Sequence, residues 1–166
     1  MTARGTGEGS AGDAGGVFEV ATGDGPPLPP ADAEQRSREV RRALDGLLQI
    51  RRLTRSRSGD PEGAPADWEL RRPVRAVALA LEAGGITPSS VDGAGERRST
   101  GYRVRAGERP GTAVVEWLGP PGAGAAREEP EALGACVPVL ARLGWDALLY
   151  KGPRGRRFLE VEPGEA

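Results

Sequence analysis

The side chains that most often perform enzyme chemistry are scarce in this sequence. Its 166 residues include no histidine and one cysteine, Cys136. Without histidine the chain cannot build a Ser-His-Asp triad, a Cys-His dyad or a histidine metal site. A single cysteine excludes an intrachain disulfide and a zinc site made of four cysteines. We therefore predict no catalytic residue, no cofactor site and no metal site, in a protein that is not an enzyme.

Two features that resemble chemical motifs are better explained as structure. Residues 119–127 are glycine-rich and lie between a predicted strand and a predicted helix, but they lack the third glycine and the Gly-Lys-Ser/Thr of nucleotide-binding loops. Glu128 and Glu129 then begin the helix, where they would repel a phosphate. Cys136 lies on the apolar stripe of that helix, and free cysteine is usually buried, so we predict that it packs in the core.

Arginine is the side chain through which this protein would bind an acidic ligand. The 23 basic residues include a single lysine, Lys151, while glycine (26) and proline (15) are also abundant. Selection for the forked guanidinium group would explain the arginine alone. Codon bias in a high-GC bacterium explains all three excesses, and we favour it. The net charge of −1 provides no overall field to attract nucleic acid or an acidic membrane.

Residues 32–57 are predicted to form an amphipathic, arginine-rich helix. Val40, Leu44 and Leu47 lie on one apolar stripe with helical spacing. Because this stripe is short, the helix needs a partner to cover it: the folded domain, a second copy of the chain or another protein. We predict Val40, Leu44 and Leu47 as the residues that bind this partner.

The alternative is that the same helix contacts nucleic acid through its arginines. Acidic residues within the helix offset part of this charge, and for that reason we favour a solvated face. In the alternative, the contacts would come from the helix, from the start of the following domain and from one face of its sheet. The residues concerned are Arg41, Arg42, Arg51 and Arg52, then Arg71, Arg72 and Arg75, and finally Arg103, Arg105, Arg156 and Phe158.

An internal repeat organises residues 68–163. Two groups of apolar residues share the same helical spacing, and each is followed by a glycine suited to a helix C-terminus and then by a strand–turn–strand pattern. The first group is Val74, Val77, Ala78 and Leu81, followed by Gly85, and the second is Leu133, Cys136, Val137 and Leu140, followed by Gly144. Residues 87–100 have no counterpart in the second unit and are predicted to form a polar loop.

The repeat predicts an α+β fold with the order α-β-β-α-β-β. Two hairpins would form a four-stranded antiparallel sheet, and both helices would cover one face of it. The other face would carry residues of both charge signs on neighbouring strands, which predicts ion pairs on a solvated surface. The alternative is an open, ligand-binding face on which Phe158 stacks against RNA bases.

The rest of the chain is predicted to lie outside this domain. Residues 1–31 are rich in glycine, proline and acidic residues and offer little apolar surface, so we predict a disordered acidic tail. Residues 58–67 have the composition of a linker. No apolar run is long enough to span a membrane, and the N-terminus lacks a signal-peptide core, so we expect a cytoplasmic protein.

Together these features predict a small adaptor without enzymatic activity. Its partner would be another protein or a second copy of itself, with no membrane and no metal involved. A nucleic-acid-binding accessory protein is the alternative.

Overall fold

The computed structural model describes residues 18–165, so the predictions for residues 1–17 lie outside the described part of the chain. The helical elements are η1 (Pro30–Asp32), α1 (Ala33–Thr54), α2 (Asp67–Arg71), α3 (Pro73–Ala83), α4 (Ala125–Ala141) and η2 (Pro153–Gly155). The strands are β1 (Ser90–Val91), β2 (Arg97–Ser99), β3 (Gly101–Ala106), β4 (Ala113–Leu118), β5 (Trp145–Lys151) and β6 (Arg157–Pro163).

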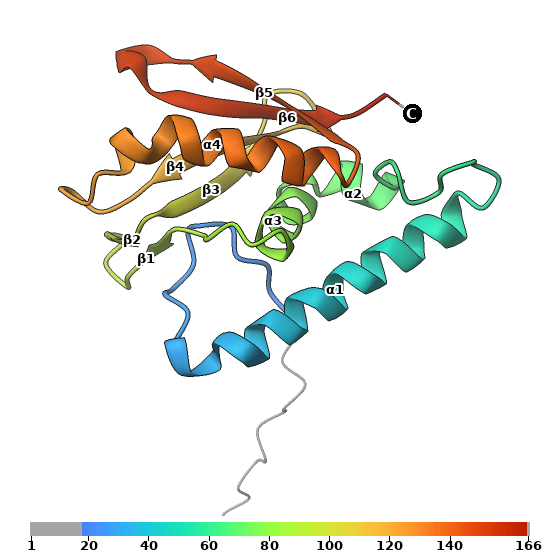
Figure 1. Ribbon diagram of the computed structural model, residues 1–166, viewed down its shortest axis with the longest axis horizontal. Coiled ribbons are helices and arrows are strands. Elements are labelled where there is room, and N and C mark those ends of the chain that lie inside the picture. Colours follow the sequence, from blue (N-terminus) through green and yellow to red (C-terminus); the bar gives the residue numbers. More distant parts are fainter. Residues whose placement is uncertain (1–17, 166) are drawn as a thin grey trace, which may run out of the picture.

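The predicted α+β fold is confirmed. Strands β3, β4, β6 and β5 form, in that order, an antiparallel sheet of four strands. Helices α3 and α4 pack together over one face of it (Figure 1). Each helix is followed by a glycine with positive φ, Gly85 at +86° and Gly144 at +82°, as the repeat predicts. For the segment 87–100 the sequence also allows a short strand near Val91; the structure has this strand as β1 and pairs it with β2, which was not predicted.

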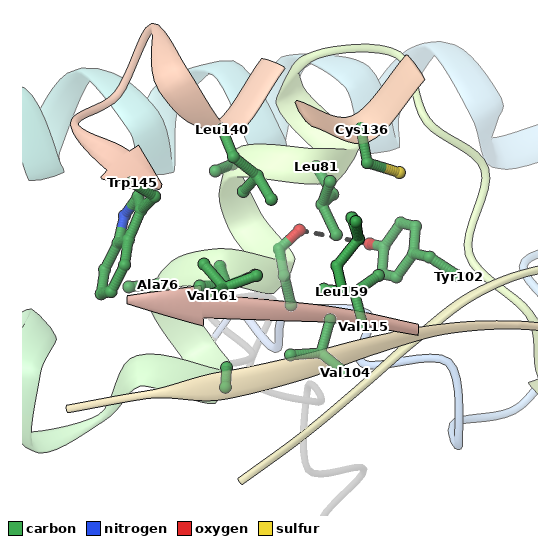
Figure 2. Close-up of a cluster of buried hydrophobic side chains, with 14 of the residues drawn as sticks. Ala76, Leu81, Tyr102, Val104, Val115, Cys136, Leu140, Trp145, Leu159 and Val161 are labelled. Carbon is green, nitrogen blue, oxygen red and sulfur yellow. Dashed lines mark hydrogen bonds between the residues drawn. The ribbon is translucent and has the colours of Figure 1, made fainter. Parts of the chain in front are cut away.

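The core lies between the sheet and the two helices of the repeat (Figure 2). Leu133, Cys136 and Leu140 are fully buried on the inner side of α4, which confirms the predicted place of the cysteine. Burial raises the pKa of the Cys136 thiol to about 12, so it is a protonated, apolar group at neutral pH. The hydroxyl of Tyr102 is satisfied at the border of the core, because its single proton lies within reach of two carbonyl oxygens, that of Ala21 at 2.8 Å and that of Ala78 at 3.2 Å.

A buried ion pair attaches the end of α1 to the domain. Arg51 donates from Nε and Nη2 to the two carboxylate oxygens of Glu69 on α2, at 2.8 and 2.7 Å. The remaining polar groups are also paired: Arg51 Nη1 donates to the carbonyl oxygen of Glu62, and Glu69 accepts from the backbone N–H of Ala66. The predicted linker, residues 58–67, therefore closes around this pair and does not separate α1 from the domain.

The apolar stripe of α1 packs on α3 of the same chain. Val40 and Leu47 are 5% and 4% exposed and form a second cluster with Leu79 of α3. At the other end of α1, Arg36 donates to both carboxylate oxygens of Glu82, at 2.9 and 2.8 Å. The sequence allows three partners for this helix. In the structure, the folded domain of the same chain covers its apolar stripe.

Residues 18–28 are held against the edge of the sheet, so the predicted tail does not extend to residue 31. The carbonyl oxygen of Thr22 accepts from the backbone N–H of Val104 on β3, at 2.7 Å, and that of Ala21 accepts from the Tyr102 hydroxyl. The segment carries few apolar side chains, but its carbonyl groups pair with donors that the edge strand would otherwise leave to water. Composition alone does not reveal this kind of contact.

Shortening Leu140 tests the core. Leu140→Ala should lower the free energy of unfolding by about 2–5 kcal/mol, because a fully buried leucine leaves a cavity when it is truncated. Urea denaturation followed by circular dichroism measures the change. Leu53→Ala is the matched control, because Leu53 is 73% exposed and its truncation should change stability by less than about 0.5 kcal/mol. A similarly small change for Leu140→Ala contradicts the assigned core.

Candidate interaction groove

The structure separates the three residues that were predicted to bind a partner. Val40 and Leu47 face α3 and are used in packing within the chain. Leu44 is half-buried and lines a shallow cavity of about 310 Å³ together with Arg41 and Ala83. Val40 also lines this cavity, and Leu47 lines a larger cavity on the other side of α1, but both are 5% exposed or less. Leu44 is therefore the most accessible of the three predicted residues.

Five of the ten arginines predicted to contact nucleic acid are paired with carboxylates. Arg51 is buried against Glu69, and Arg52 pairs with Glu62 on the surface. On the sheet, Arg103 pairs with Asp24 and Glu116, and Arg105 pairs with Glu116. The prediction that Arg156 lies on the open sheet face is wrong, because Arg156 precedes β6 and pairs with Glu129 of α4. The predicted cross-strand pair of β3 and β4 is present, since Arg103 lies directly opposite Glu116. Carboxylates thus interleave with these arginines, and the predicted set forms no continuous basic surface.

The remaining members of that set lie in three places: Arg41 and Arg42 on α1, Phe158 on β6, and Arg71, Arg72 and Arg75 at the α2–α3 junction. Arg41 and Arg42 are exposed on α1 and form no ion pair with any residue of the range 18–165. Phe158 stacks on Tyr150 of the neighbouring strand, with ring centroids 5.8 Å apart. Part of its aromatic surface is therefore used within the sheet.

The largest hollow surface of the described chain lies along the α2–α3 segment, between α1 on one side and residues 19–25 on the other. Two cavities, of about 720 and 670 Å³, adjoin there and share Val20, Arg71, Arg72 and Arg75 as lining residues. We call this surface the α1–α3 groove. Its apolar lining comes from four segments, and consists of Phe18, Val20, Ala43, Leu47, Ile50, Trp68, Val74 and Leu79.

Three arginines give the α1–α3 groove its charge. Arg71 ends α2, Arg72 joins the two helices and Arg75 lies in the first turn of α3, and all three are exposed. Within residues 18–165 no carboxylate forms an ion pair with any of them. This distinguishes them from the paired arginines of the sheet. Their guanidinium groups can therefore bind carboxylates or phosphates of a ligand.

The apolar lining also contains an unpaired donor. The indole Nε1 of Trp68 is buried and has no hydrogen-bond acceptor within the described residues. Ile50, by contrast, is 41% exposed, which is unusual for a large apolar side chain that borders a hollow. The groove thus combines exposed apolar surface with unpaired positive charge, an arrangement that binds ligands carrying both apolar and acidic groups.

One wall of the groove is held in place by Asp24. Its carboxylate accepts hydrogen bonds from Arg97 and Arg103, at 2.5 and 2.9 Å. Partial burial on its own would raise the pKa of Asp24, but the hydrogen bonds and charges of Arg103 and Arg97 outweigh it and hold the pKa below the ordinary value of 3.8. This contact fixes the segment 18–28, which supplies Phe18 and Val20 to the lining.

The sequence signal for the groove was incomplete. Arg71, Arg72 and Arg75 are visible as a basic group, but nothing in their spacing shows that they border an apolar surface. That surface exists only because Val20, Ile50 and Trp68, from three separate segments, are brought together by the fold.

Comparisons with known proteins identify no relative: no protein family, no curated protein and no solved structure matches this sequence. The helices of residues 18–165 include none that is both long and apolar enough to cross a membrane. Function must therefore be inferred from the groove itself.

Acid should release the segment 18–28 from the sheet. Because the folded-state pKa of Asp24 is lowered, its contribution to stability is present above pH 3.8 and is lost as the pH falls through the folded-state value. Amide-exchange protection of Val91 and Val104, whose N–H groups donate to this segment, should then fall relative to Val115 in the sheet centre. In Asp24→Asn the protection of Val91 and Val104 should already be lower than that of Val115 at about pH 6. Equal protection of these amides at all pH values in both proteins contradicts the assignment.

Proposed function

We propose that this protein is a non-enzymatic adaptor that binds an acidic, amphipathic segment of another protein in the α1–α3 groove. The observation that carries the proposal is the combination of an exposed apolar lining with three arginines that have no carboxylate partner within residues 18–165. Apolar side chains of the partner pack on Ile50 and Trp68, and its carboxylates pair with Arg71, Arg72 and Arg75.

The dimensions of the groove suit such a segment. Each of its two cavities, of about 670 and 720 Å³, falls in the usual range of ligand pockets. The larger cavity borders α1, and the smaller continues it past the three arginines toward residues 19–25. A helix that presents apolar side chains at i, i+3, i+4 and i+7 fills a groove of this kind. Acidic residues beside that stripe meet guanidinium groups, which bind carboxylates in a bidentate manner.

Charge favours a protein ligand with acidic residues over a basic one. Glu19, at the groove margin, is the acidic side chain that lines both this groove and the neighbouring cavity beside Arg36. Asp24 is neutralised by Arg97 and Arg103. The arginine side of the groove is therefore left with a net positive charge, which steers acidic segments toward it.

Nucleic acid is the second candidate, because the same three arginines also suit phosphate groups. Phosphate backbones gain affinity from charge and little from apolar surface, whereas most of the lining here is apolar. For this reason the peptide ligand is the better supported of the two. The two candidates differ sharply in how salt affects binding.

Selection from a display library of random helical peptides tests the proposal. The wild-type protein should enrich peptides that combine an apolar stripe with acidic residues, and Ile50→Asp combined with Arg75→Glu should not enrich them. An enriched peptide should bind Arg75→Ala about tenfold more weakly, because one charge-assisted contact is lost. Fluorescence anisotropy measures this affinity.

The matched control is the double variant Arg41→Ala and Arg42→Ala, since both side chains are exposed on α1 but line neither cavity of the groove. It should bind the enriched peptide as the wild type does. Enrichment of basic peptides, or of none, contradicts the proposal. Binding of a single-stranded oligonucleotide with a steep salt dependence that Arg71→Ala reduces by about one unit of slope supports the second candidate instead.

A further inference from the structure

The two edges of the main sheet differ. At the β3 edge, backbone groups are occupied by residues 22 and 87–89: Val104 donates to Thr22, Tyr102 donates to Thr87, and Ser89 donates to Tyr102. At the other edge, β5 pairs with β6 on one side only, and within residues 18–165 no segment pairs with its other side. The hairpin of β5 and β6 forms a border of the molecule in Figure 1. Such an open edge is a template for pairing with a further strand.

The open edge carries consecutive apolar side chains. Leu148, Leu149 and Tyr150 are 52%, 49% and 43% exposed. Side chains alternate between the faces of a strand, so Leu148 and Tyr150 lie on the outer face with Phe158, while Leu149 lies on the helix side, opposite Leu159. Exposed edges are normally protected by charges or proline, whereas residues 147–150 of β5 include neither.

The charges of the hairpin are arranged so that an antiparallel copy fits. Its tip, residues 151–157, contains Lys151, Arg154, Arg156 and Arg157 and no acidic residue. Of these four, Arg156 is paired with Glu129 within the chain. The other end carries Asp146 directly opposite Glu162; Glu162 is paired with Arg109, whereas Asp146 forms no ion pair within residues 18–165. When two such edges meet in antiparallel orientation, the basic tip of each lies beside the end of the other that carries Asp146, and twofold symmetry provides this contact twice.

We propose that β5 is a self-association surface, on which the β5 strand of a second copy pairs in antiparallel orientation. The sheets of the two copies then form one continuous sheet of eight strands, with the helices of both on the same face. The register that matches the apolar residues is centred on Leu149: Leu149 lies opposite its own copy, and Leu148 lies opposite Tyr150. Opposite residues share a face in this register, as antiparallel pairing requires.

The strength of this contact follows from its size. In this register residues 147–151 of the seven-residue strand β5 pair with the same residues of the second copy, which buries less surface than a standard stable interface of about 1,600 Å². We therefore expect a dissociation constant on the order of 10 µM, with a monomer at low and a dimer at high protein concentration. The contact is isologous and closes after two copies, so larger polymers are not expected. The surface does not involve the α1–α3 groove and is independent of the proposed ligand.

Sedimentation equilibrium over a range of concentrations tests the proposal. The 17.3 kDa chain should convert to a dimer, and amide protection of β5 should rise with concentration while that of β4 does not. Leu149→Lys places two like charges opposite each other on the symmetry axis and should raise the dissociation constant at least tenfold. Leu53→Lys, at an exposed site on α1, is the control and should dimerise as the wild type does.

Circular dichroism and urea denaturation establish that both variants are folded. If Leu149→Lys is unstable, Leu148→Lys gives a second test from the outer face of the same strand. A chain that stays monomeric throughout the concentration range overturns the proposal. So does a dimer that both variants of β5 leave unchanged, which would place self-association on another surface such as Leu44.

Discussion

The positions of α1, of the loop after it and of α2 depend on the buried ion pair of Arg51 and Glu69. The two side chains are 1% and 0% exposed, so each loses its hydration on folding. That loss is offset only when all polar groups of the pair are bonded. Arg51 and Glu69 form two parallel hydrogen bonds, Arg51 also donates to the carbonyl oxygen of Glu62, and Glu69 also accepts from the N–H of Ala66. The pair therefore requires the end of α1, the loop after it and α2 to assemble together.

The position of α1 in turn defines the α1–α3 groove. Arg51 holds one end of the helix to α2, and Arg36 holds the other end to Glu82 of α3. Arg36 also lies over the ring of Phe18, 4.6 Å from its centroid, and donates to the carbonyl oxygen of Glu19. One helix thus orders both the loop that follows it and the segment that precedes it, and the groove is the space left between these parts. The groove and the β5 edge are separate consequences of the fold, one created by α1 and the other by the strand order.

The sequence was sufficient to predict the repeat because its signals are local. The helical spacing of Leu133, Cys136 and Leu140, the glycines after the helices and the alternating strands each report on neighbouring residues, and the sheet with its two helices follows from them. Signals for contacts between distant segments are weaker. Arg51 lies four residues after Leu47 and so on the stripe that faces the domain, whereas Arg52 lies off it, but no local pattern identifies Glu69 as the partner of Arg51. The binding of Thr22 to β3 uses a backbone carbonyl, which has no signature in residue type.

If the buried pair holds α1 and the groove in place, removing it should expose the amides of α1 to exchange. Native-state amide exchange in Glu69→Gln measures this. The substitution keeps the size of the side chain but removes the charge that Arg51 requires, and a broken buried pair destabilises by about 3–5 kcal/mol. The account predicts that protection of the α1 amides falls by a factor of about 100 or more, with a smaller change in β6. Glu62→Gln, which alters only the exposed partner of Arg52, should leave α1 protected. Unchanged protection of α1 in Glu69→Gln would contradict the account.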